Sequence, residues 1–209
     1  NPISKIAKEN NVSYEAIWLT LNKNGVKNRG ESHLSNKRYS FNEKFFDTIN
    51  TEEKAYFLGL LYADGCNYFK RRTLTIFLGQ IDIDIIQKFK LLLEFTGPIY
   101  NNVKNGYGHQ LLCGIQLNSK HFSEALSKLG CFPRKTFTLK FPTEEQVPKH
   151  LIHHFMRGYF DGDGTIYKDK KKNIKRPSFG IGIVSTKDFC DEFYKSLKFL
   201  DINFYFHKK

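Results

Sequence analysis

The sequence predicts an α+β protein in which two similar halves follow a small helical unit. From residue 51 onward, apolar patterns with the period of helices alternate with shorter patterns typical of strands. A short motif recurs at an offset of 99 residues, in a similar local context both times. The first 25 residues carry helix patterns alone. A chain of 209 residues with 40% hydrophobic content is long enough, and apolar enough, to bury a core.

The charge of the chain favours a polyanionic partner. Its 33 Lys and Arg residues exceed its 21 Asp and Glu residues, which gives a net charge of +12. Such a surplus attracts nucleic acid, because bound phosphates release their condensed counterions. The sequence contains no long apolar run and opens without an apolar signal segment, so we expect no membrane partner. Four scattered cysteines without a CxxC pair predict free thiols. We therefore expect an intracellular location, in the cytoplasm or in the organelle or nucleoid that holds the target DNA.

Residues 1–27 are predicted to form a helix-turn-helix-like DNA-binding segment. Two short helix patterns occupy residues 3–25, and Ser13 stands where it can cap the second helix. Asn24 and Gly25 are typical of a helix end. If the pair is a helix-turn-helix, Ser13 and Tyr14 face the DNA groove. An ordinary helical hairpin explains the same pattern, and the sequence leaves both interpretations open.

Residues 28–50 are polar and are predicted to be a basic linker. Lys37 and Arg38 lie in it and are candidates for contact with the phosphate backbone. A solvated tether would show the same composition.

The two predicted halves occupy residues 51–145 and 146–209, and each begins with a helix. In the first half, Thr51 caps a helix that runs to Asp64. Strand patterns then alternate with helix patterns at 74–79 (strand), 84–95 (helix), 99–103 and 111–117 (strands), and 121–129 (helix). The second half starts the same order again, with a helix at 147–160, strands at 165–168 and 179–184, a helix at 187–200 and a short strand at NFYFH. We expect the second half to be shortened at its C-terminal end, because 45 residues follow Gly164.

The repeated motif is YFLGLLYADGCNY at 56–68 and FMRGYFDGDGTIY at 155–167. Gly59 corresponds to Gly158, and Asp64 corresponds to Asp163. A glycine inside a helix costs about 1 kcal/mol relative to alanine, which is tolerable where two helix backbones must nearly touch. If the two motif helices lie side by side, their ends bring Asp64 and Asp163 together. Two neighbouring carboxylates at negative helix ends repel each other, and a divalent cation relieves that repulsion. The motif thus predicts a shared Mg²⁺ site.

The segments FLGLLYADG (57–65) and MRGYFDGDG (156–164) resemble the two signature motifs of the LAGLIDADG homing endonucleases. The resemblance covers about residues 51–209. It implies a pseudo-symmetric pair of αββαββα halves with antiparallel, saddle-shaped sheets, and it places the motif helices at the interface. It also implies that one chain acts as a monomer and that Asp64 and Asp163 bind the metal ions.

The resemblance further implies catalytic roles for Gln80, at a strand end near the metals, and for Lys135, near the scissile phosphates. It implies that the strands and hairpins of both halves bind DNA. The basic candidates there are Lys70, Arg71, Arg72, Lys104, Lys168, Lys170, Lys171, Lys172, Lys175 and Arg176.

The function implied is that of a site-specific double-strand DNA endonuclease of a mobile element, which hydrolyses phosphodiester bonds with Mg²⁺. Mn²⁺ or Ca²⁺ would substitute for Mg²⁺ in binding. Two alternatives use the same fold: a maturase that binds intron RNA, and a regulator that binds DNA without cutting it. Asp64 and Asp163 are both present, which favours the nuclease over the regulator.

Overall fold

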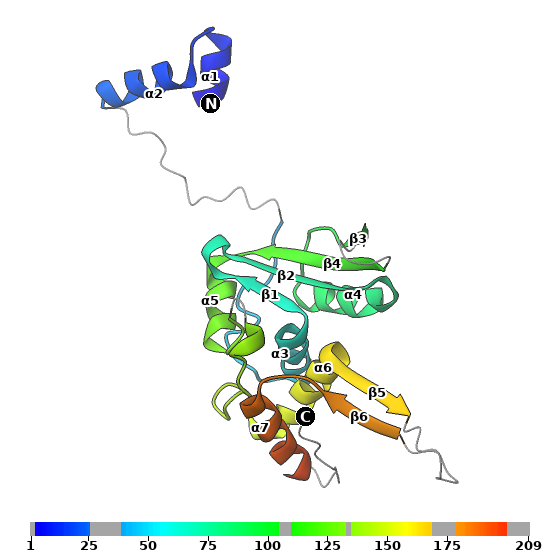
Figure 1. The fold of residues 1–209 in the computed structure, drawn as a ribbon. Helices are drawn as coiled ribbons and strands as arrows, with labels where there is room; N and C mark the ends of the chain where they lie inside the picture. Colours follow the sequence, from blue (N-terminus) through cyan, green and yellow to red (C-terminus); the bar gives the residue numbers. More distant parts are fainter. Residues whose placement is uncertain (1–2, 26–38, 105–109, 133–134, 169–178, 200–209) are drawn as a thin grey trace. The chain divides into compact units, whose positions relative to one another are not determined.

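The computed structural model describes residues 3–25, 39–104, 110–132, 135–168 and 179–199 (Figure 1). The described residues form a mixed α+β protein with antiparallel sheets, as the sequence predicts. The chain divides into a small unit, Asn1–Arg38, and a large unit, Tyr39–Lys209. No helix of the described ranges is long and apolar enough to cross a membrane. All four cysteines are free thiols, which confirms that prediction.

The small unit is a pair of helices, α1 (Ile3–Glu9) and α2 (Tyr14–Lys23). The hydroxyl of Ser13 accepts a hydrogen bond of 3.1 Å from the backbone N–H of Ala16, which is the predicted cap. Gly25 has a φ of +65°, a left-handed conformation that suits the residue after a helix. The two predicted helices are confirmed, and DNA binding by this unit stays a prediction.

The large unit begins earlier than the sequence predicts. Residues 39–50 were assigned to a linker, but Phe45, Phe46 and Ile49 are buried in the core. The rings of Phe45 and Phe46 meet edge to face with centroids 4.9 Å apart. The linker prediction is therefore wrong for this segment, because its few aromatic residues, set among polar neighbours, are enough to anchor it in the core. Lys37 and Arg38 lie outside the described residues.

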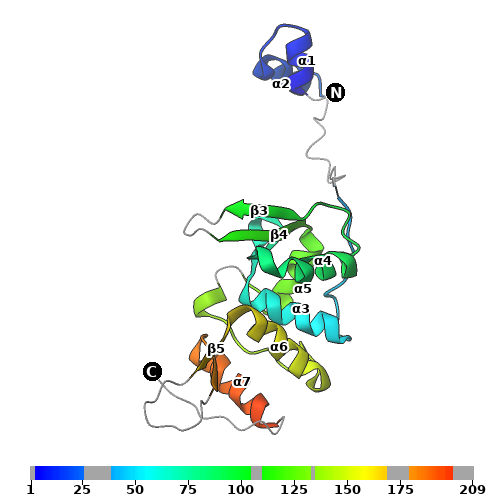
Figure 2. The same cartoon turned by 90° about the vertical axis from the view of Figure 1, so that its right-hand side faces the viewer.

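Two helices lie side by side at the centre of the large unit, as both views show (Figures 1 and 2). They are α3 (Glu52–Ala63) and α6 (Ile152–Asp163). The hydroxyl of Thr51 caps α3 by accepting from the backbone N–H of Lys54. A single 3₁₀ turn, Lys149–Leu151, precedes α6. This helix starts later than the predicted residue 147, because a residue before proline, here Val147, disfavours the helical conformation, and Pro148 itself has an extended ψ of 143°.

A four-stranded antiparallel sheet follows α3, in the spatial order β1-β2-β4-β3. Its strands are β1 (Gly65–Tyr68), β2 (Thr73–Gly79), β3 (Tyr100–Lys104) and β4 (Leu111–Asn118). A 3₁₀ turn, Phe69–Arg71, joins β1 to β2. The register between β3 and β4 shifts between Tyr100 and Val103, which marks a bulge. Strand β1 has no clear signal in the sequence, because it is short and contains glycine and asparagine.

One face of this sheet is buried under helices. Figure 2 shows α4 (Ile83–Leu92) and α5 (Lys120–Lys128) on the same side of the sheet as α3. Leu74, Ile76 and Leu78 alternate along β2 toward this face and are buried. The order α3-β1-β2-α4-β3-β4-α5 therefore forms one layer of strands over one layer of helices.

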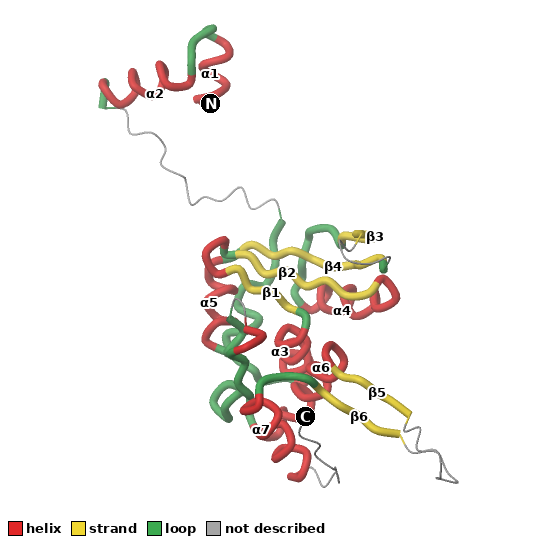
Figure 3. The backbone as a smooth tube through the Cα atoms, viewed as in Figure 1, coloured by secondary structure: helices red, strands yellow, loops and turns green. Residues whose placement is uncertain are grey.

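The chain after α6 forms a smaller sheet of two antiparallel strands (Figure 3). These are β5 (Gly164–Lys168) and β6 (Phe179–Ile183), followed by α7 (Lys187–Phe199). Gly164 pairs with Ile183 just as Gly65 pairs with Ile76 in the first sheet. The predicted strand at NFYFH lies outside the described residues.

Candidate metal-binding site and nucleic-acid interface

The contact between α3 and α6, here called the helix seam, is formed where glycines replace side chains. A Cβ added to Gly59 would lie 2.0 Å from the carbonyl oxygen of Phe155. A Cβ added to Gly158 would lie 1.9 Å from the carbonyl oxygen of Tyr56. Real Cβ atoms do not approach oxygen so closely, so only glycine permits these backbones to touch. The structure thus supports the packing role predicted for Gly59 and Gly158.

Side chains on both sides of the glycines fix the seam further. The hydroxyl of Tyr56 on α3 donates a hydrogen bond of 2.8 Å to Oδ2 of Asp161 on α6. The guanidinium of Arg157 lies over the ring of Tyr56, 4.9 Å from its centroid. The rings of Tyr62 and Phe155 meet edge to face at 5.0 Å. The two helices are therefore fixed relative to each other along most of their length.

Asp64 and Asp163 lie at the C-terminal ends of these two helices and are both exposed. Although solvent reaches Asp64, the surrounding protein partly desolvates its carboxylate and raises its pKa to about 6. The negative charge of Asp163 is the next cause of this rise. The carboxylate of Asp64 also lies against Gly162, the residue before Asp163, because a Cβ added to Gly162 would lie 2.7 Å from its Oδ2. The structure thus brings together two acids that stand 99 residues apart in the sequence. They are called the carboxylate pair below.

Lys135 lies beside Asp64, in a 3₁₀ turn that spans Lys135–Phe137. Its Nζ donates hydrogen bonds to the carbonyl oxygens of Gly65, at 2.6 Å, and of Ala63, at 3.4 Å. Its positive charge opposes the rise in the pKa of Asp64. The structure shows that Lys135 binds carbonyls at the C-terminal end of α3, and its predicted place near a scissile phosphate stays a prediction.

Gln80 has a different neighbour from the one expected. Its Oε1 accepts a hydrogen bond of 3.0 Å from the backbone N–H of Asn102, within the bulge of β3. Asn102 has a left-handed φ of 53°, so this contact supports a strained residue. The catalytic role of Gln80 stays a prediction, while the contact found is a structural one.

Two residues near the carboxylate pair are not among the predicted site residues. The charge of Asp82, at the start of α4, also raises the pKa of Asp64. Tyr159 on α6 is buried, which raises the pKa of its hydroxyl to about 12, and that hydroxyl lies within reach of Ser185 and Asp163. Asp82 stands three residues after the end of β2, and an acid at such a strand end is a signal of a site residue that the sequence does contain. Nothing in the sequence distinguishes Tyr159 from other aromatic residues of the core.

The carboxylate pair fits a divalent cation in the chemistry of its donors. Mg²⁺ takes oxygen ligands and is commonly held by one or two carboxylates, with waters and substrate phosphates as its other ligands. Asp64 and Asp163 supply two such carboxylates at an exposed position. The described residues contain no group of three or more His, Cys, Asp or Glu side chains that could hold a metal ion. The protein alone would therefore hold an ion weakly, and a bound phosphate would complete its ligands.

Basic side chains gather at the turn between β1 and β2, at one end of the first sheet. Lys70 and Arg71 belong to the 3₁₀ turn, Arg72 follows it with a φ of 55°, and all three are exposed. Lys104 is exposed at the end of β3, and Lys168 is exposed at the end of β5. Their exposure is compatible with phosphate contact, which stays a prediction. The other basic candidates of the second half lie outside the described residues: Lys170, Lys171, Lys172, Lys175 and Arg176.

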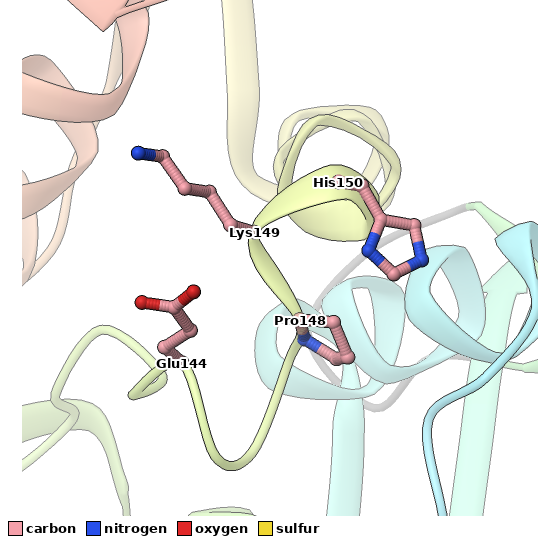
Figure 4. A pocket seen from close by; sticks show the side chains of 4 residues that line it. All are labelled: Glu144, Pro148, Lys149 and His150. Atoms are coloured by element: carbon pink, nitrogen blue, oxygen red, sulfur yellow. The ribbon is translucent and has the colours of Figure 1, made fainter.

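A shallow depression lies at the opposite end of α6 from Asp163. It is lined by Glu144, Pro148, Lys149 and His150, which precede the helix (Figure 4). A helix of 12 residues spans about 18 Å, so this depression is remote from the carboxylate pair. It is shallow and open, and it has no part in the site described above.

The comparisons with known proteins give one relative and no family. No protein-family model matches the chain. The chain is 27% identical over 136 residues to the DNA-directed RNA polymerase subunit Rpo1C of Methanocaldococcus jannaschii. The matched region covers 62% of this chain and 15% of that protein. The chain thus corresponds to a small part of its relative.

This similarity contradicts the predicted function. The relative is named as an RNA polymerase subunit, and that points to a function other than that of a homing endonuclease. The prediction of a LAGLIDADG homing endonuclease of a mobile element is therefore wrong by this comparison. The intron maturase and the DNA-binding regulator rest on the same resemblance, so the comparison speaks against them as well.

Proposed function

We infer that this chain binds nucleic acid and holds a divalent cation at Asp64 and Asp163, against the phosphodiester backbone. We infer further that it hydrolyses a phosphodiester bond of that backbone. The observation that carries this inference is that Asp64 and Asp163 are exposed at neighbouring ends of α3 and α6, where the carboxylate of Asp64 lies against Gly162 and feels the charge of Asp163. The name of the relative, a DNA-directed RNA polymerase subunit, supports nucleic acid as the partner. The net charge of +12 supports the same partner class.

The proposed ligand set is the carboxylate pair together with water and phosphate oxygens. A bound Mg²⁺ would supply Lewis acidity and would lower the pKa of bound water. Lys135 neutralises part of the negative charge around Asp64 and keeps the end of α3 fixed. The basic turn at Lys70 and Arg71 would bind flanking phosphates. Both carboxylates come from one chain, so a monomer is sufficient.

The proposed architecture is a pair of related halves on either side of the helix seam. The equivalent pairings of Gly65 with Ile76 and of Gly164 with Ile183 support this relationship. The repeated motif around Gly59 and Gly158 supports it as well. An intracellular location follows from a nucleic-acid partner.

The test is a cleavage and binding assay on the full chain. Supercoiled duplex DNA and an RNA transcript are incubated with the protein in Mg²⁺, in Ca²⁺ or in EDTA, and the products are mapped. We expect strand scission that needs Mg²⁺ and that is lost in Asp64→Asn and Asp163→Asn. Binding in Ca²⁺ should persist in both variants, because the basic turn is untouched.

Two controls make the outcome decisive. Asp188→Asn changes one exposed carboxylate on α7, outside the repeated motif, and should leave scission unchanged. Retention of full scission in either variant of the carboxylate pair would remove that residue from the mechanism. Absence of Mg²⁺-dependent products on both substrates, with binding intact, would refute hydrolysis and leave a binding protein.

A further inference from the structure

Gly162 lies between the two acids of its motif, in FDGDG, and faces α3 across the helix seam. A Cβ added to Gly162 would lie 2.7 Å from Oδ2 of Asp64 and 3.5 Å from its Cγ. The carboxylate of Asp64 thus rests directly on the backbone of the helix that carries Asp163. A side chain at residue 162 would occupy the space that the carboxylate of Asp64 now fills.

The same added Cβ would also meet Ala63, whose own Cβ would be only 2.4 Å away. Ala63 and Gly162 are equivalent positions of the repeated motif, 99 residues apart. At this level of the seam there is consequently room for one methyl group, and Ala63 on α3 carries it. The two halves differ at this point, although their motifs correspond elsewhere.

A side chain added at residue 162 would meet two kinds of obstacle, and the two would have different consequences. The Cβ of Ala63 is fixed to its backbone, so that clash would push the helices apart. Oδ2 of Asp64 is the end of a short side chain, so that clash would turn the carboxylate away instead. Packing of the seam and placement of the carboxylate can therefore be separated by substitution.

We propose that Gly162 is a positioning residue for Asp64: its missing side chain leaves the notch in which the Asp64 carboxylate is held toward Asp163. This inference rests on the proposed metal site and extends it by a residue that touches neither ion nor substrate. Gly162 decides where one ligand of the pair stands, and it does so from the opposite helix.

The substitutions that test this are Gly162→Ala, Ala63→Gly, and the double variant Ala63→Gly/Gly162→Ala. The double variant moves the single methyl group from α3 to α6. It removes the clash between the Cβ atoms of residues 63 and 162, which would lie 2.4 Å apart. It keeps the clash between the Cβ of residue 162 and Oδ2 of Asp64, which would lie 2.7 Å apart. Ala63→Gly alone keeps the notch open and serves as the matched control for the added glycine.

Three quantities are measured on the full chain: the urea midpoint in EDTA, Mn²⁺ affinity by electron paramagnetic resonance, and the ¹³C chemical shift of the Asp64 carboxyl at fixed pH. We expect Gly162→Ala to lower the urea midpoint and the Mn²⁺ affinity together. The double variant should recover the urea midpoint of Ala63→Gly. Its Mn²⁺ affinity should stay at least tenfold below that of Ala63→Gly, and the Asp64 carboxyl signal should be displaced.

A double variant that binds Mn²⁺ as tightly as Ala63→Gly and keeps its Asp64 signal would overturn the positioning role. Failure of the metal site itself looks different, because then the unsubstituted chain binds no Mn²⁺, or Asp64→Asn binds as well as it does. In that case the carboxyl signal of Asp64 still tests the positioning role. A signal displaced in the double variant relative to Ala63→Gly supports that role, and an unmoved signal refutes it.

Discussion

Gly158 of α6 faces the carbonyl oxygen of Tyr56 on α3 so closely that an added Cβ would lie 1.9 Å from that oxygen. The two backbones are in direct contact here, so an added side chain could be accommodated only if the helices moved apart. The helix seam therefore determines how the C-terminal ends of α3 and α6 lie relative to each other, and with them Asp64 and Asp163.

Gly158→Ala should strongly destabilise the protein. Inserting a methyl group into a well-packed contact typically costs about 1–3 kcal/mol, and here the obstacle is a fixed backbone atom. The free energy of unfolding, measured by urea denaturation, should fall by at least the lower figure. Gly182→Ala is the matched control, because the nearest atom to its added Cβ is 3.9 Å away. Equal stability of the two variants would show that the seam is looser than described.

Asn67→Ala should destabilise the first sheet against α5. The buried amide of Asn67 donates to the carbonyl oxygens of Ser123 and Cys131, at 3.0 Å each, and its Oδ1 accepts from the hydroxyl of Ser123 at 2.5 Å. Removing it leaves buried polar groups unpaired and opens a cavity, at a cost of about 2–4 kcal/mol. Thermal unfolding monitored by circular dichroism measures the loss. Asn118→Ala, at an exposed strand end, should cost far less.

Asp64→Asn should stabilise the metal-free protein more at pH 7 than at pH 4. The pKa of Asp64 is raised from 3.8 to about 6 in the folded protein, so between these values the folded state binds more protons than the unfolded state. The contribution of Asp64 to stability therefore falls as the pH rises through that window, and Asn is free of this penalty. Because solvent reaches Asp64, the effect will be small. Urea denaturation in EDTA at both pH values measures it, and a difference between variant and parent that stays constant with pH would contradict it.

Lys135→Met should raise the pKa of Asp64 above its present value. The ammonium of Lys135 now favours the ionised carboxylate, and methionine keeps much of the volume without the charge. The ¹³C carboxyl signal of Asp64, followed by NMR across pH 4–9, reports the change. Lys140→Met removes an exposed lysine of the same chain and should leave the curve of Asp64 unmoved. A curve unaffected by Lys135→Met would place the ammonium farther away than the structure does.

Lys70→Ala/Arg71→Ala should weaken nucleic-acid binding in proportion to two lost phosphate contacts. Each contact contributes roughly 0.9 to the slope of log affinity against log salt on duplex DNA, so the slope should fall by about two. Fluorescence anisotropy of a labelled duplex between 50 and 200 mM salt gives the slope. Lys195→Ala, an exposed lysine on α7, serves as the control, since it already pairs with Glu192 at 2.6 Å. An unchanged slope would exclude the basic turn from the interface.

The sequence alone determined the elements whose causes are local. The cap at Thr51, the helix that follows it and the strand at 74–79 each follow from a few neighbouring residues, and the structure has them close to where they were predicted. The repeat around Gly59 and Gly158 also indicated two helices in close contact. These features could be predicted because their signals lie within one turn or one strand.

Tertiary structure alone decided which atoms meet. It placed the carboxylate of Asp64 against the backbone of Gly162. It also formed the hydrogen bonds from Lys135 to the carbonyl of Gly65 and from the backbone of Asn102, in the bulge of β3, to Gln80. It also placed Phe45, Phe46 and Ile49 in the core, in a segment whose polar residues suggest a linker. Such contacts join residues far apart in the chain, so their distances depend on how two separately formed elements fit together. A periodic pattern determines which face of a helix is buried, and the packing of that face then determines what each side chain touches.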